Sequence, residues 1–172
     1  MTIPAHRIEN NIRLSINKFI KDTFETPNSF TGQVNYQDSE FSAIDKDQWI
    51  SISFLSAGAG RKGETLLQAD IFSRAIGKTT GGDRYSVERD RIARLFYEAM
   101  HVDSIQIYNF SIPASPVILD KRKILVQNAN GTFREPNEDV ILDGITDGIA
   151  RRTLTYRLRL LDDTSDADSY YD

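Results

Sequence analysis

The feature that most constrains the fold of this chain is helical periodicity in residues 5–23, followed by two segments in which apolar and polar residues alternate. In residues 5–23 the apolar side chains recur every three or four positions, which predicts an amphipathic helix. Residues 49–55 and 66–73 alternate in the way of strands with one buried face. Because a single glycine-rich loop separates these two strands, we expect them to pair as an antiparallel hairpin.

A second helix is expected to begin at Asp83 or Ser86, either of which can cap its first turn, and to end near Met100. Its charged side chains stand three and four positions apart. This spacing predicts surface ion pairs between Glu88 and Arg91 and between Asp90 and Arg94.

In the last third of the chain, apolar and polar residues again alternate with a period of two. This pattern predicts strands at Ser104–Ile112, Val117–Leu119, Lys123–Gln127 and Arg151–Leu161, with a tight turn at Asn130-Gly131 and a further short strand earlier, at Gln33–Tyr36. This order predicts one α+β domain over residues 1–161, in which a mixed or antiparallel β-sheet packs against two amphipathic helices.

The charge of the chain is unevenly distributed. The formal net charge of the 172 residues is −4, yet five of the 25 acidic side chains lie in residues 162–172, which contain no basic residue. Residues 1–161 therefore hold 20 acidic against 21 basic side chains. We expect a nearly neutral folded body and a disordered acidic carboxyl-terminal tail at 162–172.

The sequence favours an intracellular protein without a membrane contact. It contains no cysteine, which excludes disulfides and thiolate chemistry. No segment approaches the about 18 consecutive apolar residues of a membrane span. The amphipathic first 20 residues also lack the pattern of a secretory signal.

Two glycine-containing segments imitate nucleotide-binding motifs. Residues 58–63 match the letters of a dinucleotide-binding loop, but residues 65–72 after them are expected to form a strand and not the required helix. Gly77-Lys78-Thr79 resembles the end of a phosphate-binding loop, but Phe72 stands where that motif needs glycine. We therefore expect no nucleotide cofactor and interpret residues 58–63 as a flexible hairpin tip.

No metal or catalytic site is expected either. His6 and His101 lie far apart and have no partners at ligand spacing, and the acidic run that starts at Asp162 lacks the glycine and glutamate of a calcium loop. No serine stands in a nucleophile elbow, and the acidic residues of the body form no evident catalytic pair. The sequence thus favours a protein that is not an enzyme.

Four arginines, Arg151, Arg152, Arg157 and Arg159, lie in the closing strand without an intervening acid. Three interpretations remain open for them. They form a solvated strand face, or a charged strand edge or face that pairs with a neighbouring subunit, or a nucleic-acid surface, which the nearly neutral body disfavours.

The order of elements in residues 5–160 resembles that of phage tail terminator proteins. The similarity is carried by the amphipathic helix Arg7–Asp22, the tryptophan-led strand Trp49–Phe54, a glycine-containing loop, the strand Leu67–Ser73 with Gln68 near its start, and the long helix Arg84–Met100. Proteins of this family are small α+β subunits of a hexameric ring on the last ring of a long tail tube.

The resemblance implies a structural virion protein without catalytic activity, made in the host cytoplasm and placed at the head-proximal end of the tail. Its ring, a homohexamer, would cap the tail tube, end tube polymerisation and offer a docking face to the head connector. Its partners would be copies of itself, the tail-tube protein and the head-completion protein, with DNA only as passing cargo. The alternatives are a head-closure or adaptor subunit, a tail-tube or baseplate subunit, and then a small cytosolic ligand-binding domain.

Such a ring needs partner-binding surfaces, and we expect them on two loops and on the closing strand. The loops are Gly58–Glu64 and Arg74–Asp83, chosen for their glycine and charge content. The candidate interface residues are Arg61, Lys62, Glu64, Arg74, Lys78, Arg84, Arg157 and Arg159. If DNA passes through the ring, an acidic tail beside the channel would keep the DNA from adhering.

Overall fold

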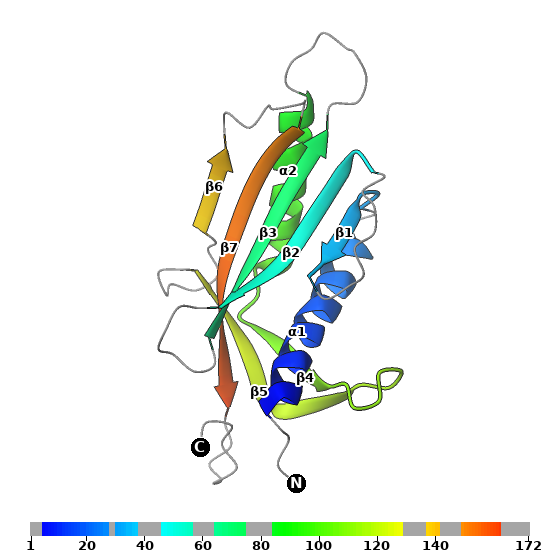
Figure 1. Cartoon of the computed structure of the whole chain (residues 1–172), viewed down its shortest axis with the longest axis vertical. Coiled ribbons are helices and arrows are strands. Elements are labelled where there is room, and N and C mark those ends of the chain that lie inside the picture. Colours follow the sequence, from blue (N-terminus) through cyan, green and yellow to red (C-terminus); the bar gives the residue numbers. More distant parts are fainter. Residues whose placement is uncertain are drawn as a thin grey trace.

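A computed structural model describes residues 5–27, 30–37, 46–56, 64–74, 84–128, 137–141 and 149–162 (Figure 1). The helical elements are α1 (Ala5–Ile20), the π-helical turn η1 (Lys21–Glu25) that continues it, and α2 (Arg84–Met100). The strands are β1 (Gln33–Tyr36), β2 (Gln48–Ser56), β3 (Glu64–Arg74), β4 (Ser104–Asn109), β5 (Val117–Asn128), β6 (Asn137–Ile141) and β7 (Ile149–Asp162). The chain thus forms one α+β domain, as expected.

The strands form one mixed, strongly curled sheet in the order β1-β2-β3-β7-β5-β4, a half-barrel more than a flat sheet (Figure 1). β1 runs parallel to β2, and the other described pairs are antiparallel. β7 is central. β3 pairs with one of its edges from Ile149 to Arg159, while β6 and β5 share the other edge.

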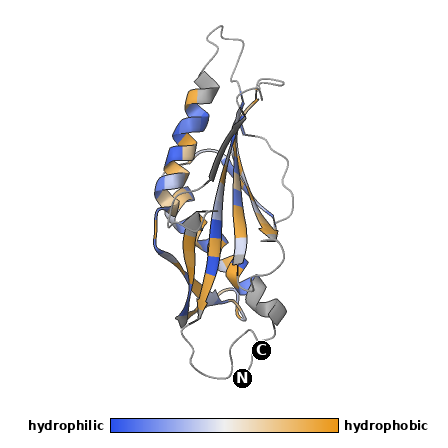
Figure 2. Cartoon of the chain, turned by 90° about the vertical axis from the view of Figure 1, so that its left-hand side faces the viewer, coloured by the Kyte–Doolittle hydropathy of each residue, from blue (hydrophilic) through white to orange (hydrophobic). Residues whose placement is uncertain are grey.

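One apolar core joins one face of the sheet to both helices, and Figure 2 shows the hydrophobic bands of the strands that supply it. The predicted alternation of β2 is confirmed, because Ile50, Ile52 and Phe54 are all buried. The same face carries Leu67, Ala69 and Ile71 of β3 and Leu154, Tyr156 and Leu158 of β7. The helices contribute Ile16, Ile20, Phe24, Ile92, Phe96 and Met100.

Two polar residues of α1 are buried because they cover the edge of β4. The Ser15 hydroxyl accepts a hydrogen bond from the Tyr108 backbone N–H at 2.9 Å. The Asn11 side-chain oxygen accepts one from the Phe110 N–H at 3.1 Å. These side chains take the place of a further strand, so α1 protects an edge that would otherwise be open to pairing.

Two predictions for the last third need correction, and one strand was missed. The strand expected at Ser104–Ile112 ends at Asn109, whose side-chain oxygen accepts the Ser111 N–H at 3.0 Å and starts a turn. The two short strands expected at Val117–Leu119 and Lys123–Gln127 are one strand, β5. β6 was not predicted at all, and the expected turn at Asn130-Gly131 lies outside the described residues.

Of the two ion pairs predicted on the second helix, one is confirmed and one is wrong. Arg91 donates to Glu88 at 2.8 Å through its Nε. Asp90, however, binds Arg152 of β7 at 3.1 Å, and Arg94 binds Glu98 at 2.9 Å. Asp90 thus pairs with Arg152 of another element and with Arg89 of its own helix, and Arg94 pairs with Glu98 instead.

Candidate interaction surface

The sheet face turned away from both helices, here called the outer face, carries the candidate site. It is formed by the side chains of β2, β3 and β7 that point away from the apolar core, and two of them, Trp49 and Thr153, are buried on that face. The pairing aligns them in rows across the three strands, Trp49 with Phe72 and Arg151, Ser51 with Asp70 and Thr153, and Ser53 with Gln68 and Thr155. Neighbouring side chains in a row lie close enough to interact.

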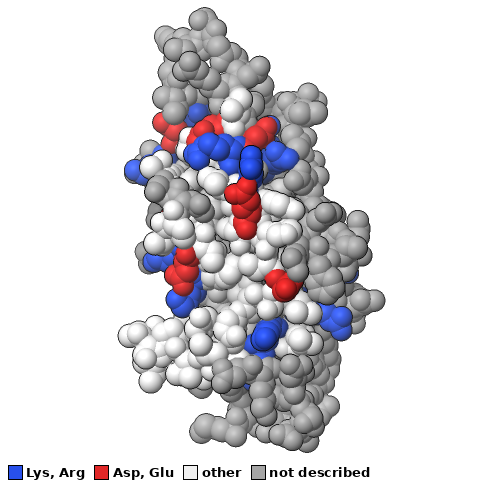
Figure 3. Space-filling model, turned by 180° about the vertical axis from the view of Figure 1, so that it is seen from behind, with Lys and Arg blue, Asp and Glu red and all other residues white. Residues whose placement is uncertain are grey.

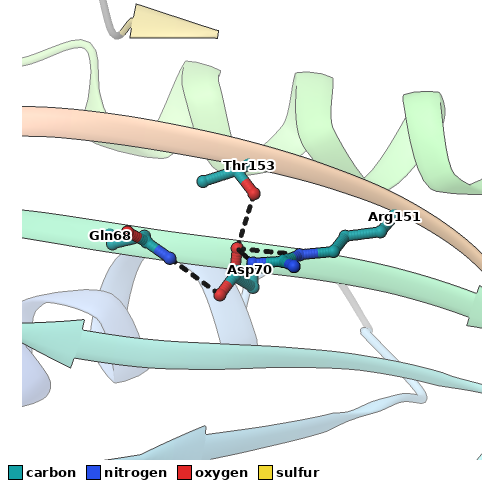
Figure 4. A network of polar contacts seen from close by, with 4 residues as sticks. All are labelled: Gln68, Asp70, Arg151 and Thr153. Atoms are coloured by element: carbon teal, nitrogen blue, oxygen red, sulfur yellow. Dashed lines mark hydrogen bonds and ion pairs between the residues drawn. The ribbon is translucent and has the colours of Figure 1, made fainter. Parts of the chain in front are cut away.

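Asp70, in the middle of β3, accepts hydrogen bonds from three polar side chains around it (Figure 4). One carboxylate oxygen accepts hydrogen bonds from Arg151 at 2.8 and 3.2 Å and from the Thr153 hydroxyl at 2.6 Å. The other oxygen accepts one from the Gln68 amide at 2.9 Å. Because the Asp70 side chain is only 14% exposed, these charge-assisted bonds hold Arg151 in one position.

Two arginines lie over an aromatic pair beside this network. The rings of Trp49 and Phe72 are stacked, with centroids 4.8 Å apart and an interplanar angle of 11°. The guanidinium of Arg151 lies 5.6 Å from the Phe72 ring, and that of Arg74 lies 5.4 Å from the Trp49 ring. Cation–π attraction therefore orders both arginines, while Arg74 stays exposed and Arg151 partly exposed.

A second charged cluster lies on the helix side of the sheet, where Figure 3 shows basic and acidic atoms gathered in the upper part of the molecule. Arg89 of α2 is buried and binds Asp90 at 2.8 Å, and Arg152 of β7 binds the same carboxylate oxygen. The arginines of β7 are thus divided between two faces. Arg152 joins β7 to α2, while Arg151, Arg157 and Arg159 alternate onto the outer face.

The structure separates the interface residues that the sequence suggested. Arg74 lies near Arg151 at one end of the outer face, where the two share the Trp49–Phe72 pair. Half-buried Arg157 and exposed Arg159 lie farther along β7, and Arg159 stands opposite Glu64 in the pairing with β3. Arg84 is the first residue of α2.

Some of the predicted interface residues lie outside the described part of the chain. These are Arg61, Lys62 and Lys78, together with most of the loops Gly58–Glu64 and Arg74–Asp83 and the tail beyond Asp162. The proposal that the arginine-rich strand forms a sheet edge is wrong, because β7 has neighbours on both sides. On its outer face, Arg151 is partly exposed and Arg159 is exposed.

Sequence reasoning missed the aromatic and acidic members of this surface. Asp70 is a charged residue in the middle of a strand with a buried face, and that placement is a signal for a cross-strand partner. The partner, Arg151, is 81 positions away, and nothing in the alternation of β3 indicates that β7 pairs with it.

The described residues form no metal-binding cluster and include no helix that could span a membrane. That part of the chain holds no group of three or more His, Cys, Asp or Glu side chains arranged to bind a metal ion. None of the helices that the structure describes combines the length and the apolar character needed to cross a membrane.

Comparisons with known proteins assign no family. No family model matches the sequence, and no curated protein matches it. One solved chain, 12% identical, superposes on 88% of this chain and 94% of its own length with a TM-score of 0.49.

Proposed function

We propose that the chain is a structural virion subunit of the tail-terminator type and not an enzyme. In this proposal several copies, a hexamer by resemblance to that family, close into a ring on the last ring of a tail tube. The ring ends polymerisation of the tube and gives the head connector its docking face. DNA crosses the ring only as cargo.

The observation that carries the proposal is the pair of ordered arginines, Arg74 and Arg151, over the stacked rings of Trp49 and Phe72. Arginine and aromatic side chains are the types that dominate the binding energy of protein interfaces. Because Asp70 and the rings already fix the guanidinium of Arg151, a partner that binds there loses less conformational entropy. This end of the outer face is suited to a protein partner.

A terminator also needs more than one contact surface, because each subunit meets its neighbours in the ring, the tube and the connector. A ring closes only through a heterologous contact, in which two different patches of each subunit meet. The outer face carries Asp70 bound to Arg151 and the helix side carries Asp90 bound to Arg152, so the two sides present different residues to a partner. We assign the arginine end of the outer face to the tube or to the connector.

Genetic complementation tests this function. A virus that lacks the chain should produce tails of uncontrolled length, and the wild-type chain should restore normal tails joined to heads. The double variant Arg74→Ala with Arg151→Ala should restore neither, whereas Arg94→Ala, which removes an exposed arginine of α2, should act as wild type.

Each result has a defined meaning. Normal tails that fail to join heads in the deletion would replace termination with head closure. A double variant that behaves as wild type would contradict the assignment of the arginine end to a partner protein.

A further inference from the structure

The outer face carries basic side chains where β5 and β7 lie side by side, in the lower part of the molecule (Figure 1). Lys123 of β5 stands opposite Leu161 of β7, and in the next outer-face row Leu125 stands opposite Arg159. Lys123 and Arg159 are exposed, and half-buried Arg157 adds a third positive charge one row farther along β7. Lys123, Arg157 and Arg159 are here called the basic region.

The paired strand residues around the basic region do not balance its charge. Glu64 of β3 stands opposite Arg159 and is acidic. In the same three rows, the other described partners of β2, β3, β4 and β5 are uncharged. Three basic residues thus share these rows with one acidic residue. Such an excess favours an anionic occupant, because complementary charge selects the partner of a surface.

The same chain supplies acidic residues directly after this surface. β7 ends at Asp162, the first residue of the acidic tail 162–172. The tail holds five acidic residues and no basic one. Its charge is therefore opposite to that of the basic region, and it starts one position beyond Leu161.

The reach of the tail selects this end of the outer face over the arginine end. Asp168 follows Asp162 by six positions, and an extended chain advances about 3.5 Å per residue, so it can reach back about 20 Å. Arg159 and Arg157 precede Asp162 by only three and five positions of β7, within that range. Arg151 precedes it by eleven positions, about 36 Å along an extended strand, and lies beyond the reach of Asp168.

The apolar side chains beside the basic region suit the two tyrosines of the tail. Arg157 stands opposite half-buried Leu66, which in turn stands opposite Leu55, a residue 42% exposed. Charged and apolar side chains thus alternate over this part of the face. Tyr170 and Tyr171 combine an apolar ring with a polar hydroxyl, and such side chains fit a mixed surface.

We propose that the acidic tail folds back on its own chain and docks on the basic region, with its aspartates on Lys123, Arg157 and Arg159. The tether at Asp162 keeps the tail at a high effective concentration beside this region, so weak individual contacts suffice. The composition of the tail favours disorder in isolation, and the contact with the basic region orders it.

The docked tail neutralises the basic region. Nucleic acid and acidic proteins then find no excess of positive charge there, since such partners bind chiefly through exposed basic side chains. The arginine end of the outer face, which the acids near the start of the tail do not reach, stays open to a partner. This inference does not depend on the proposed ring, because it concerns a contact within one copy.

A nitroxide spin label in the tail tests the contact, because the natural chain has no cysteine that would compete for the label. Ala167→Cys carries the label, and methyl NMR spectra of the full chain with isotope-labelled leucines report which leucines lie near it. We expect the label to broaden the methyl signals of Leu55 and Leu66. The signal of Leu95, in α2 on the other side of the sheet, should stay sharp.

Charge reversal separates docking from tethering alone. Lys123→Glu with Arg159→Glu should lower the broadening of the two outer-face leucines by about twofold or more, because attraction becomes repulsion. Arg74→Glu with Arg94→Glu changes the net charge by the same amount at two other exposed positions and should leave the broadening unchanged. Equal broadening in both double variants would overturn the proposal.

A change confined to the tail provides a second test that leaves the folded body untouched. Asp163→Asn with Asp166→Asn and Asp168→Asn keeps the length of the tail and removes three of its charges. The broadening should fall as it does on charge reversal. A neutralised tail that broadens the same signals as the wild type would show that charge does not hold it, and would overturn the proposal.

A mixing experiment decides which copy the tail contacts. Spin-labelled chains without isotope are mixed with isotope-labelled chains without the spin label. We expect no broadening of Leu55 and Leu66 in this mixture. Broadening would place the tail on a neighbouring copy and overturn the contact within one chain.

Discussion

Asp70 holds Arg151 across the β3–β7 pair, with 2.8 Å between the carboxylate oxygen and Nη2. This bond joins residues 81 positions apart and fixes an arginine over the Phe72 ring. Asp70 therefore does two things: it joins β3 to β7, and it positions Arg151 of the candidate interface.

Asp70→Asn should destabilise the fold and loosen the outer face. The amide keeps the size of the carboxylate but brings an NH₂ group where three side chains donate, so at least one donor loses its partner. We expect a loss of about 1–3 kcal/mol in the free energy of unfolding, measured in urea. Asp22→Asn, which removes one member of an exposed pair with Lys18, should change it by less than about 1 kcal/mol. Equal effects of both variants would contradict the role of Asp70.

Ser15→Ala and Asn11→Ala should each destabilise the protein although they replace polar residues on a helix. Each removes the acceptor of a backbone N–H on the edge of β4, and an unsatisfied donor costs about 1–3 kcal/mol. Thermal unfolding measures the loss. Asn10→Ala, on the exposed side of the same helix, is the control and should leave the midpoint nearly unchanged.

Trp49 is the single tryptophan of the chain, so its fluorescence reports on the arginine end of the outer face. Arg74→Ala removes the cation from above its ring and should shift the emission. Because Arg74 is exposed, stability should fall by less than about 1 kcal/mol. Arg94→Ala should leave the emission unchanged. An identical spectrum for Arg74→Ala would show that this arginine does not lie over the ring in solution.

Tyr36 makes stability depend on pH in the alkaline range. Burial raises the pKa of its hydroxyl above the ordinary value, and the hydrogen bond donated to Glu25 raises it further. A phenol with a higher pKa in the folded state contributes stability below the unfolded pKa of about 10 and loses it as the pH rises beyond. The difference in unfolding free energy between wild type and Tyr36→Phe should therefore shrink above about pH 10. A constant difference across this range would contradict the hydrogen bond that Tyr36 donates to Glu25.

Periodicity predicted much of the fold, because both helices and the strands β2, β3 and β7 each bury one continuous apolar face. It missed β6, since the segment Asn137–Ile141 is short and contains two acids. It also split β5, whose register shifts against β4 between Gln106 and Tyr108.

The candidate site was predictable only in part. Alternation in β7 correctly separates Arg157 and Arg159 from the buried leucines. The partnership of Asp70 with Arg151 and the stacking of Trp49 on Phe72 depend on which strands pair, and pairing between distant segments follows from the whole core and not from local pattern. Arg152 was grouped with the other arginines of β7, but it binds Asp90 of α2, and this contact also depends on how distant segments pack.

Growth of the tail tube in the presence of the chain tests the terminator proposal most directly. Purified tube protein is allowed to polymerise with and without the chain, and the tube ends are imaged by electron microscopy. We predict that the chain stops elongation and leaves a closed ring at one end of each tube, and that the Arg74→Ala, Arg151→Ala double variant does not. Tubes that grow to the same lengths with the wild-type chain, with no ring at either end, would contradict the proposal.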